Sequence, residues 1–174
     1  MFNDPEFANK EEWDAYAWFG FALSEAQTIE MLLQVVATAI SMNTMQSTDR
    51  SRHWATLYDS FGRLTLGTLL NKVKSYNEVQ LSEDLVQMLY EVRDIRNRLA
   101  HSFFRPSDSA VSNTDTLGMV TRELQAAASS FRHASTRLEV EVYGILDQLR
   151  VTRVEAEARL AKRLNEEDSG GDVH

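Results

Sequence analysis

Cysteine is absent from the sequence, and proline and glycine are scarce, at two and seven of 174 residues. The absence of cysteine excludes disulfides, thiolate metal ligands and a cysteine nucleophile. The scarcity of proline and glycine permits long uninterrupted helices. The longest apolar run, near residues 31–40, is interrupted by Gln34 and Thr38, so we expect no membrane-spanning segment. The first residues lack the basic segment and apolar core of a secretory signal, and we therefore expect a cytoplasmic protein.

The sequence also lacks a positive net charge. Its formal net charge of −8 argues against broad electrostatic binding to nucleic acid. The charges are unevenly distributed, because segment 93–105 holds four arginines and one aspartate, whereas acidic residues concentrate in 6–14, 78–91 and 155–172. A local basic region on an acidic body suits a small anionic target better than a long duplex.

Apolar residues recur at helical spacing through most of the chain. The first pattern predicts a helix over about residues 9–43. Its expected core face is Phe19, Ala22, Ala26, Ile29, Leu33, Val36 and Ile40. Within residues 51–76 the pattern changes phase at Gly62 and Gly67, which predicts two shorter helices or one bent helix.

Two further helices follow. Ser82 is the expected N-cap of a helix that ends before Pro106, because the residue preceding a proline avoids the α region. A last long helix starts near Ser112, and its expected core face is Val120, Leu124, Ala127, Phe131, Ala134, Leu138, Val142, Ile145 and Leu149. An unbroken helix to Leu164 would be about 75 Å long. We therefore expect a bend near Gly144 or a projection beyond the bundle.

These elements predict an all-α fold, an up-down bundle of about five helices. No repeat, low-complexity tract or long linker divides the sequence. We therefore expect one domain over residues 1–165, followed by a polar, disordered tail over residues 166–174.

The helix that leads to Pro106 has an arginine in its apolar stripe. The expected core positions are Leu85, Leu89, Val92, position 96, Leu99 and Phe103. Burying an unpaired guanidinium is costly, so Arg96 has a buried partner, opens into a cleft or lies at a subunit interface. Asn97 and His101 are four residues apart on a neighbouring face, and Arg93 extends that face by one turn.

The segment Arg96-Asn97-Arg98-Leu99-Ala100-His101 resembles the R-N-x-x-x-H motif of the HEPN superfamily. Members are small all-helical domains, many of which are metal-independent ribonucleases and toxins. The motif covers six residues, and the helical layout of about the first 150 residues is compatible with the superfamily. The resemblance implies a HEPN-like bundle and an endoribonuclease that needs neither a metal ion nor another cofactor.

The resemblance further implies RNA cleavage by Arg96, Asn97 and His101. A ribose 2′-hydroxyl would attack the adjacent phosphate and leave a 2′,3′-cyclic phosphate. His101 is the natural proton-transfer group, since imidazoles exchange protons near neutral pH. Arg96 would hold the phosphate and stabilise developing charge, and Asn97 would orient the imidazole or the RNA. The expected substrate-binding side chains are Arg93, Arg98 and Arg105.

Helix geometry predicts that this site needs two copies of the chain. On a straight helix, residues at the spacing of Arg96 and His101 point roughly 140° apart. One chain does not easily focus both side chains on one phosphate, whereas a homodimer with two facing motif helices does. HEPN enzymes that resemble this chain use such a dimer, and the toxins among them imply an antitoxin or regulatory protein as a further partner.

The same residues have structural interpretations. His101 also fits a polar helix end, Arg96 a buried ion pair and Arg98 a surface pair with Asp94. Many HEPN toxins carry a tyrosine two residues after the motif histidine, where some receive a nucleotide, but Phe103 here has no hydroxyl. The chain is thus an active ribonuclease, a catalytically inactive HEPN-like binding or regulatory module that acts through a protein or nucleotide partner, or a helical scaffold with a coincidental motif.

Overall fold

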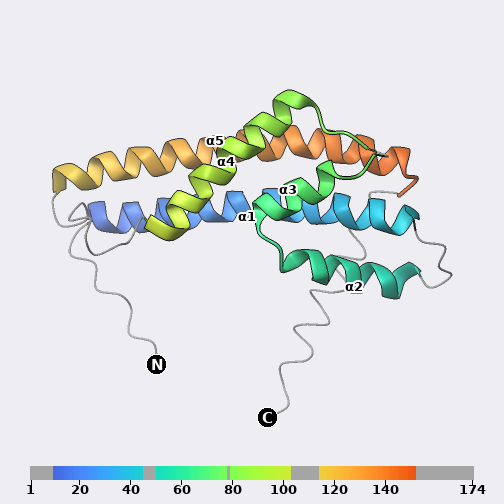
Figure 1. Ribbon diagram of the computed structural model, residues 1–174. Coiled ribbons are helices and arrows are strands. Elements are labelled where there is room, and N and C mark those ends of the chain that lie inside the picture. The colour runs from blue at the N-terminus through green and yellow to red at the C-terminus, as the bar shows by residue number, and fades with distance from the viewer. Residues whose placement is uncertain (1–9, 45–49, 78, 103–113, 152–174) are drawn as a thin grey trace, which may run out of the picture. The chain divides into compact units, whose positions relative to one another are not determined.

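The computed structural model of the chain describes residues 10–44, 50–77, 79–102 and 114–151. These residues form five α-helices and no strand, which confirms the predicted all-α helical bundle (Figure 1). The helices are α1 (Lys10–Thr44), α2 (Arg50–Gly62), α3 (Leu66–Lys74), α4 (Glu83–Ser102) and α5 (Thr114–Gln148). None of these five helices combines the length and the apolarity that crossing a membrane requires.

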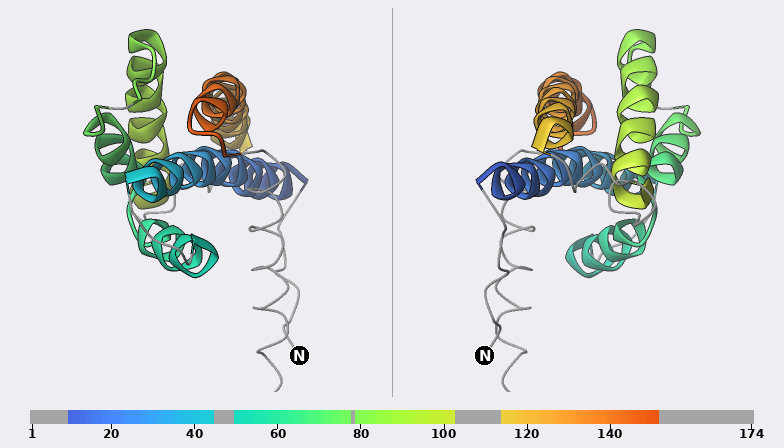
Figure 2. Two further views of the ribbon diagram at one scale, coloured as in Figure 1. Left: turned by 90° about the vertical axis from the view of Figure 1, so that its right-hand side faces the viewer. Right: turned by 90° about the vertical axis from the view of Figure 1, so that its left-hand side faces the viewer.

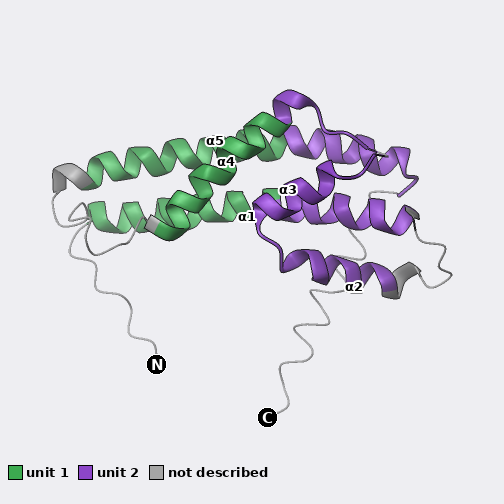
Figure 3. Cartoon of the chain, in the orientation of Figure 1, with its two compact units in different colours: residues 1–29, 86–136 green, residues 30–85, 137–174 purple. Residues whose placement is uncertain are grey.

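The helices belong to two compact units (Figure 3). Unit 1 comprises residues 1–29 and 86–136, and unit 2 comprises residues 30–85 and 137–174. Helices α1, α4 and α5 each contribute to both units, whereas α2 and α3 belong to unit 2 alone. The single domain predicted over residues 1–165 stays a prediction, and the predicted polar tail lies outside the described residues.

Unit 1 contains parts of three helices. The segments of α1 and α5 run in the same direction, and α4 crosses them in the opposite sense (Figures 1 and 2). Each segment has a stripe of buried side chains, among them Ala22, Ala26 and Ile29 of α1, Leu89, Val92 and Leu99 of α4, and Leu124, Phe131 and Ala134 of α5. The three-and-four spacing of these stripes confirms the predicted core faces, except that Phe19 of α1 and Val120 of α5 are only half-buried. Leu149, the last predicted core residue, lies just beyond α5 and is also half-buried.

Unit 2 has a core of its own, with buried side chains that include Leu33, Val36, Ile40, Trp54, Phe61, Leu66, Leu69, Leu70, Leu138 and Val142. Helices α2 and α3 are separate, which confirms two shorter helices and not one bent helix within residues 51–76. Helix α2 ends at Gly62. Thr65 caps α3, because its Oγ1 accepts a hydrogen bond from the Thr68 N–H at 3.3 Å. Gly67 lies inside α3 and not at the break.

Ser82 directly precedes α4, as predicted for its N-cap, and ties the helix start to α5 within unit 2. Its N–H donates to Glu141 Oε2 at 2.9 Å, and its hydroxyl donates to Glu141 Oε1. Arg137 Nη2 of α5 also donates to Asp84 Oδ2 at 2.7 Å. Two side chains of α5 therefore hold the first turn of the motif helix.

Helix α5 continues through Gly144 and ends at Gln148. Arg150 has a left-handed φ of 54°, and the next N–H donates to the Leu146 carbonyl oxygen at 2.9 Å. This pair of features is a Schellman-type helix end, with an arginine where glycine is usual. The predicted projection of the helix beyond the bundle lies outside the described residues.

We expect Arg137→Gln to raise the pKa of Asp84 towards its ordinary value. The hydrogen bond from Arg137 is the main cause that holds the pKa of this carboxyl below that value, and a hydrogen bond with Ser82 adds to it. A lowered folded-state pKa stabilises the fold above the unfolded-state pKa, and this contribution disappears as pH falls through the folded-state pKa.

The advantage of the wild type over Arg137→Gln should therefore shrink in acid. Carboxyl NMR titration measures the pKa, and urea unfolding at a series of pH values measures the stability. An Asp84 pKa that is unchanged in the variant would contradict the assignment of this hydrogen bond as the cause.

Candidate functional site

Helix α4 carries the motif near its C-terminal end, within unit 1. Val92 and Leu99 lie one turn to either side of Arg96, and both are 2% exposed. The Arg96 side chain itself is half-buried, whereas Asn97 and His101 are exposed. Arg96 therefore lies at the border of the core and not within its sealed interior.

The helix brings two of the three predicted catalytic side chains to one face. Asn97 and His101 are one turn apart on an uninterrupted helix, so they share an exposed surface. Arg96 and His101 are separated by roughly 140° about the helix axis. Within one chain, α4 therefore presents an amide and an imidazole together and the guanidinium on the adjoining, half-buried side.

Arg93 contacts side chains of its own helix. Its Nη2 lies 2.6 Å from Asp94 Oδ1, and its Nε donates to the same oxygen at 2.8 Å. Its guanidinium carbon also lies 4.9 Å from the ring centre of Tyr90, within cation–π range. These contacts occupy part of the hydrogen-bonding capacity that was expected to serve a substrate.

Arg98 forms an ion pair with α5, in which its Nη2 lies 2.6 Å from Glu123 Oε1. This pair replaces the predicted contact between Arg98 and Asp94, because Asp94 is engaged by Arg93 and the Arg98 side chain extends to the neighbouring helix. The side chains of Arg98 and Glu123 are 59% and 49% exposed. Exposed pairs of this kind are worth about 0.2–1 kcal/mol, so a phosphate can displace the acid at small cost.

Two predicted features lie outside the described residues: Arg105, the third expected substrate-binding arginine, and Phe103, which stands where many HEPN toxins have tyrosine. Within the described ranges, no three His, Asp or Glu side chains are grouped as a metal site would require. The chemistry that the described part of the motif offers is that of imidazole, amide and guanidinium groups.

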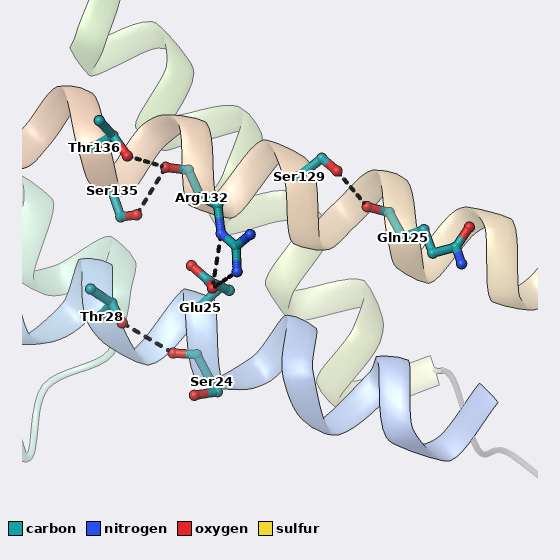
Figure 4. A network of polar contacts seen from close by, with 8 residues as sticks. All are labelled: Ser24, Glu25, Thr28, Gln125, Ser129, Arg132, Ser135 and Thr136. Atoms are coloured by element: carbon teal, nitrogen blue, oxygen red, sulfur yellow. Dashed lines mark hydrogen bonds and ion pairs between the residues drawn. The ribbon is translucent and has the colours of Figure 1, made fainter. Parts of the chain in front are cut away.

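The structure also contains a polar cluster in unit 1 that sequence reasoning missed (Figure 4). Arg132 of α5 donates from Nε and Nη2 to Glu25 Oε1 of α1, at 3.2 and 2.7 Å. The same guanidinium lies 5.0 Å from the ring centre of Phe21. The two charged residues are 107 positions apart, and each lies in an ordinary amphipathic pattern, so no local signal could have paired them.

Comparison with known proteins finds no relative: no family model, no curated protein and no solved structure matches the chain. The resemblance to the HEPN superfamily is therefore a hypothesis that depends on the motif and on its place in α4.

The exposed pair between Arg98 and Glu123 is expected to contribute about 0.2–1 kcal/mol to the free energy of unfolding. A double-mutant cycle with Arg98→Ala and Glu123→Ala, measured by urea unfolding, isolates this coupling energy. Added salt should reduce it, because both side chains are exposed to screening ions. A coupling of several kcal/mol that resists salt would show that Arg98 is structural and not available to a substrate.

Proposed function

We propose that this chain is a HEPN-type, metal-independent endoribonuclease that cleaves RNA at a composite site formed by two copies of the chain. The observation that carries the proposal is the R-N-x-x-x-H motif at the end of α4, where Asn97 and His101 share an exposed face and Arg96 borders the core. We further propose a toxin or defence role in the cytoplasm, controlled by an antitoxin or another regulatory protein.

In the proposed reaction, a ribose 2′-oxygen attacks the adjacent phosphorus and the 5′-oxygen of the next nucleotide leaves. One His101 imidazole accepts the proton of the 2′-hydroxyl, and the resulting imidazolium returns a proton, through water, to the leaving oxygen. Arg96 binds the non-bridging phosphate oxygens, where negative charge develops in the transition state. Asn97 orients the imidazole or the RNA. The products are a 2′,3′-cyclic phosphate and a 5′-hydroxyl.

Two properties of the motif surface support the composite site and its RNA substrate. The angular separation of Arg96 and His101 makes a single copy a poor catalyst, and a second copy supplies the missing group on the other side of the phosphate. Arg93 precedes the motif and Arg98 lies within it, and both form exposed or partly exposed ion pairs. An RNA phosphate can replace the acidic partner in each pair, because surface ion pairs are weak.

The same ion pairs favour a second candidate function. A HEPN-like module without turnover would bind a protein or nucleotide partner through this surface. Both expected substrate-binding arginines of the described residues contact carboxylates, and the net charge of −8 opposes the approach of a long polyanion. The negative net charge repels a partner with one compact charged group less than it repels RNA.

Wild-type protein is expected to cleave RNA in the presence of EDTA. His101→Ala and Arg96→Ala should each slow cleavage roughly 10²–10⁴-fold, the range for loss of a positioned catalytic group. His53→Gln is the matched control, because it removes an imidazole in α2, outside the motif. Gel analysis gives the rate, and mass spectrometry identifies the cyclic phosphate.

Each other outcome of this experiment has a definite meaning. Equal cleavage by the wild type and all variants would indicate a contaminant or a different site. Absence of cleavage with every RNA, from a folded dimer, would favour the binding module. Loss of cleavage in EDTA would contradict the metal-independent reaction.

Mixing Arg96→Ala protein with His101→Ala protein is expected to restore cleavage that neither variant has alone. A mixed dimer contains one intact Arg96 and one intact His101 on opposite copies, which is one competent half of the composite site. Co-expression with two different affinity tags isolates the mixed dimer, and analytical ultracentrifugation gives its mass. A mixed dimer as inactive as its parents, or a monomeric wild type at micromolar concentration, would exclude the composite site.

A further inference from the structure

A surface pocket of about 410 Å³ lies between α1 and α5 in unit 1. Pockets for small molecules begin at about 300 Å³, so this one has room for a single small ligand. Its α1 wall is aromatic and its α5 wall is polar. The side chains that define these walls are Trp18 and Phe21 on α1, and Ser129, Arg132, His133 and Thr136 on α5.

The pocket is separate from the motif. Glu123 of α5 contacts Arg98 of the motif helix, and Arg132 of α5 contacts Glu25 of α1. Nine residues separate Glu123 from Arg132, which places them roughly 180° apart around α5. The pocket therefore lies on the other side of α5 from the motif contact, and a site there does not rest on the proposed ribonuclease activity.

The contacts of the Arg132 guanidinium position it to bind an anionic group. Its Nε and Nη2 donate to Glu25 Oε1, and its guanidinium lies over the Phe21 ring. A guanidinium has five N–H donors, and these two bonds use two of them. Figure 4 shows the second terminal nitrogen on the side away from Glu25. Glu25 is 16% exposed and Arg132 is 62% exposed, so solvent and ligands reach the arginine before the acid.

The charge of Glu25 limits the anion that this site accepts. The carboxylate of Glu25 already neutralises the charge of the guanidinium, with its Oε1 2.7 Å from Arg132 Nη2. A ligand with one negative charge can take the outer edge of Arg132 and share it with Glu25, as planar Arg–carboxylate pairing allows. A doubly charged phosphate meets more repulsion from Glu25 at the same distance.

The hydroxyl groups of the pocket can accept hydrogen bonds from a ligand. Ser129 donates to the Gln125 carbonyl oxygen, and Thr136 donates to the Arg132 carbonyl oxygen, both at 2.9 Å. A hydroxyl has one hydrogen and two lone pairs, so these two oxygens keep lone pairs for a ligand. A ligand with an N–H or O–H group matches them.

The aromatic wall selects a planar ring. Trp18 and Phe21 meet edge to face, with ring centres 5.6 Å apart and planes at 81°. Phe21 is 38% exposed, so its burial under a ligand ring removes apolar surface from water. Aromatic pairs add a further favourable contact.

We propose that this pocket binds a small planar aromatic carboxylate that carries an N–H or O–H donor. Its ring lies against Trp18 and Phe21, its carboxylate accepts hydrogen bonds from Arg132, and its donor group contacts the hydroxyl of Ser129 or Thr136.

Calorimetric titration of the full chain with three related compounds tests each element of this ligand. Indole-3-carboxylate has the ring, the carboxylate and the N–H. Indole lacks the carboxylate, and cyclohexanecarboxylate lacks the aromatic ring and the donor. We expect indole-3-carboxylate to bind roughly 10- to 100-fold more tightly than either, which is the range for losing a charge-assisted hydrogen bond or an aromatic contact.

Two arginine variants separate the pocket from the general charge of α5. Arg132→Gln should reduce the affinity for indole-3-carboxylate to that for indole. Arg137→Gln should leave it unchanged, since Arg137 is another ion-paired arginine of α5 but contacts Asp84 in unit 2. Phe21→Leu is a second pocket variant, and it should weaken the aromatic compounds more than cyclohexanecarboxylate. Circular dichroism verifies that each variant is folded.

Three outcomes would overturn the proposal. The first is equal binding of the three compounds, or none. The second is binding of indole-3-carboxylate that survives Arg132→Gln. The third is tighter binding of adenosine monophosphate than of indole-3-carboxylate, which would assign the pocket to a nucleotide phosphate.

Discussion

The burial of the apolar stripe of α4 is the constraint on which the candidate site depends. Leu89, Val92 and Leu99 are buried, which fixes the rotation of the helix about its axis. Because successive residues turn by about 100°, this rotation also fixes the directions of the motif side chains. Arg96 follows the stripe and so stays partly covered, and the next residue already points to solvent. The geometry of the motif is therefore a consequence of core packing.

Electrostatic contacts position α4 without adding much stability. Within unit 2, the first turn of the helix is bound to α5 through the contacts of Ser82 with Glu141 and of Asp84 with Arg137. Within unit 1, Arg98 contacts α5 near the motif. Exposed ion pairs contribute little free energy, whereas the buried leucines of the same helix each contribute several times more. Such contacts select the position of the helix and can exchange partners without loss of the fold.

Helical periodicity predicted the parts of the structure that depend on local pattern. The core faces of α1 and α5 and the division into α2 and α3 were predictable, because burial of a stripe is recorded in the spacing of its residues. The ion-pair partner of Arg98 was not predictable. Asp94 at i−4 and Glu123 on another helix are equal candidates until the fold brings one of them within contact distance. The Glu25–Arg132 pair and its pocket depend on a contact across 107 residues, for which the sequence has no signal.

The paired arginines of the motif surface change how salt acts on a polyanionic ligand. For an ordinary basic surface, each phosphate contact releases counterions, so affinity falls steeply as salt rises. At Arg93 and Arg98 the phosphate must first displace a carboxylate, and salt weakens that competing pair as well. The two effects oppose each other, so we expect the affinity of the proposed RNA substrate for this surface to depend less on salt than the number of its arginines implies. Under the proposed function, these ion pairs would favour a ligand that also engages Arg96, Asn97 and His101 over polyanions that contact Arg93 and Arg98 alone.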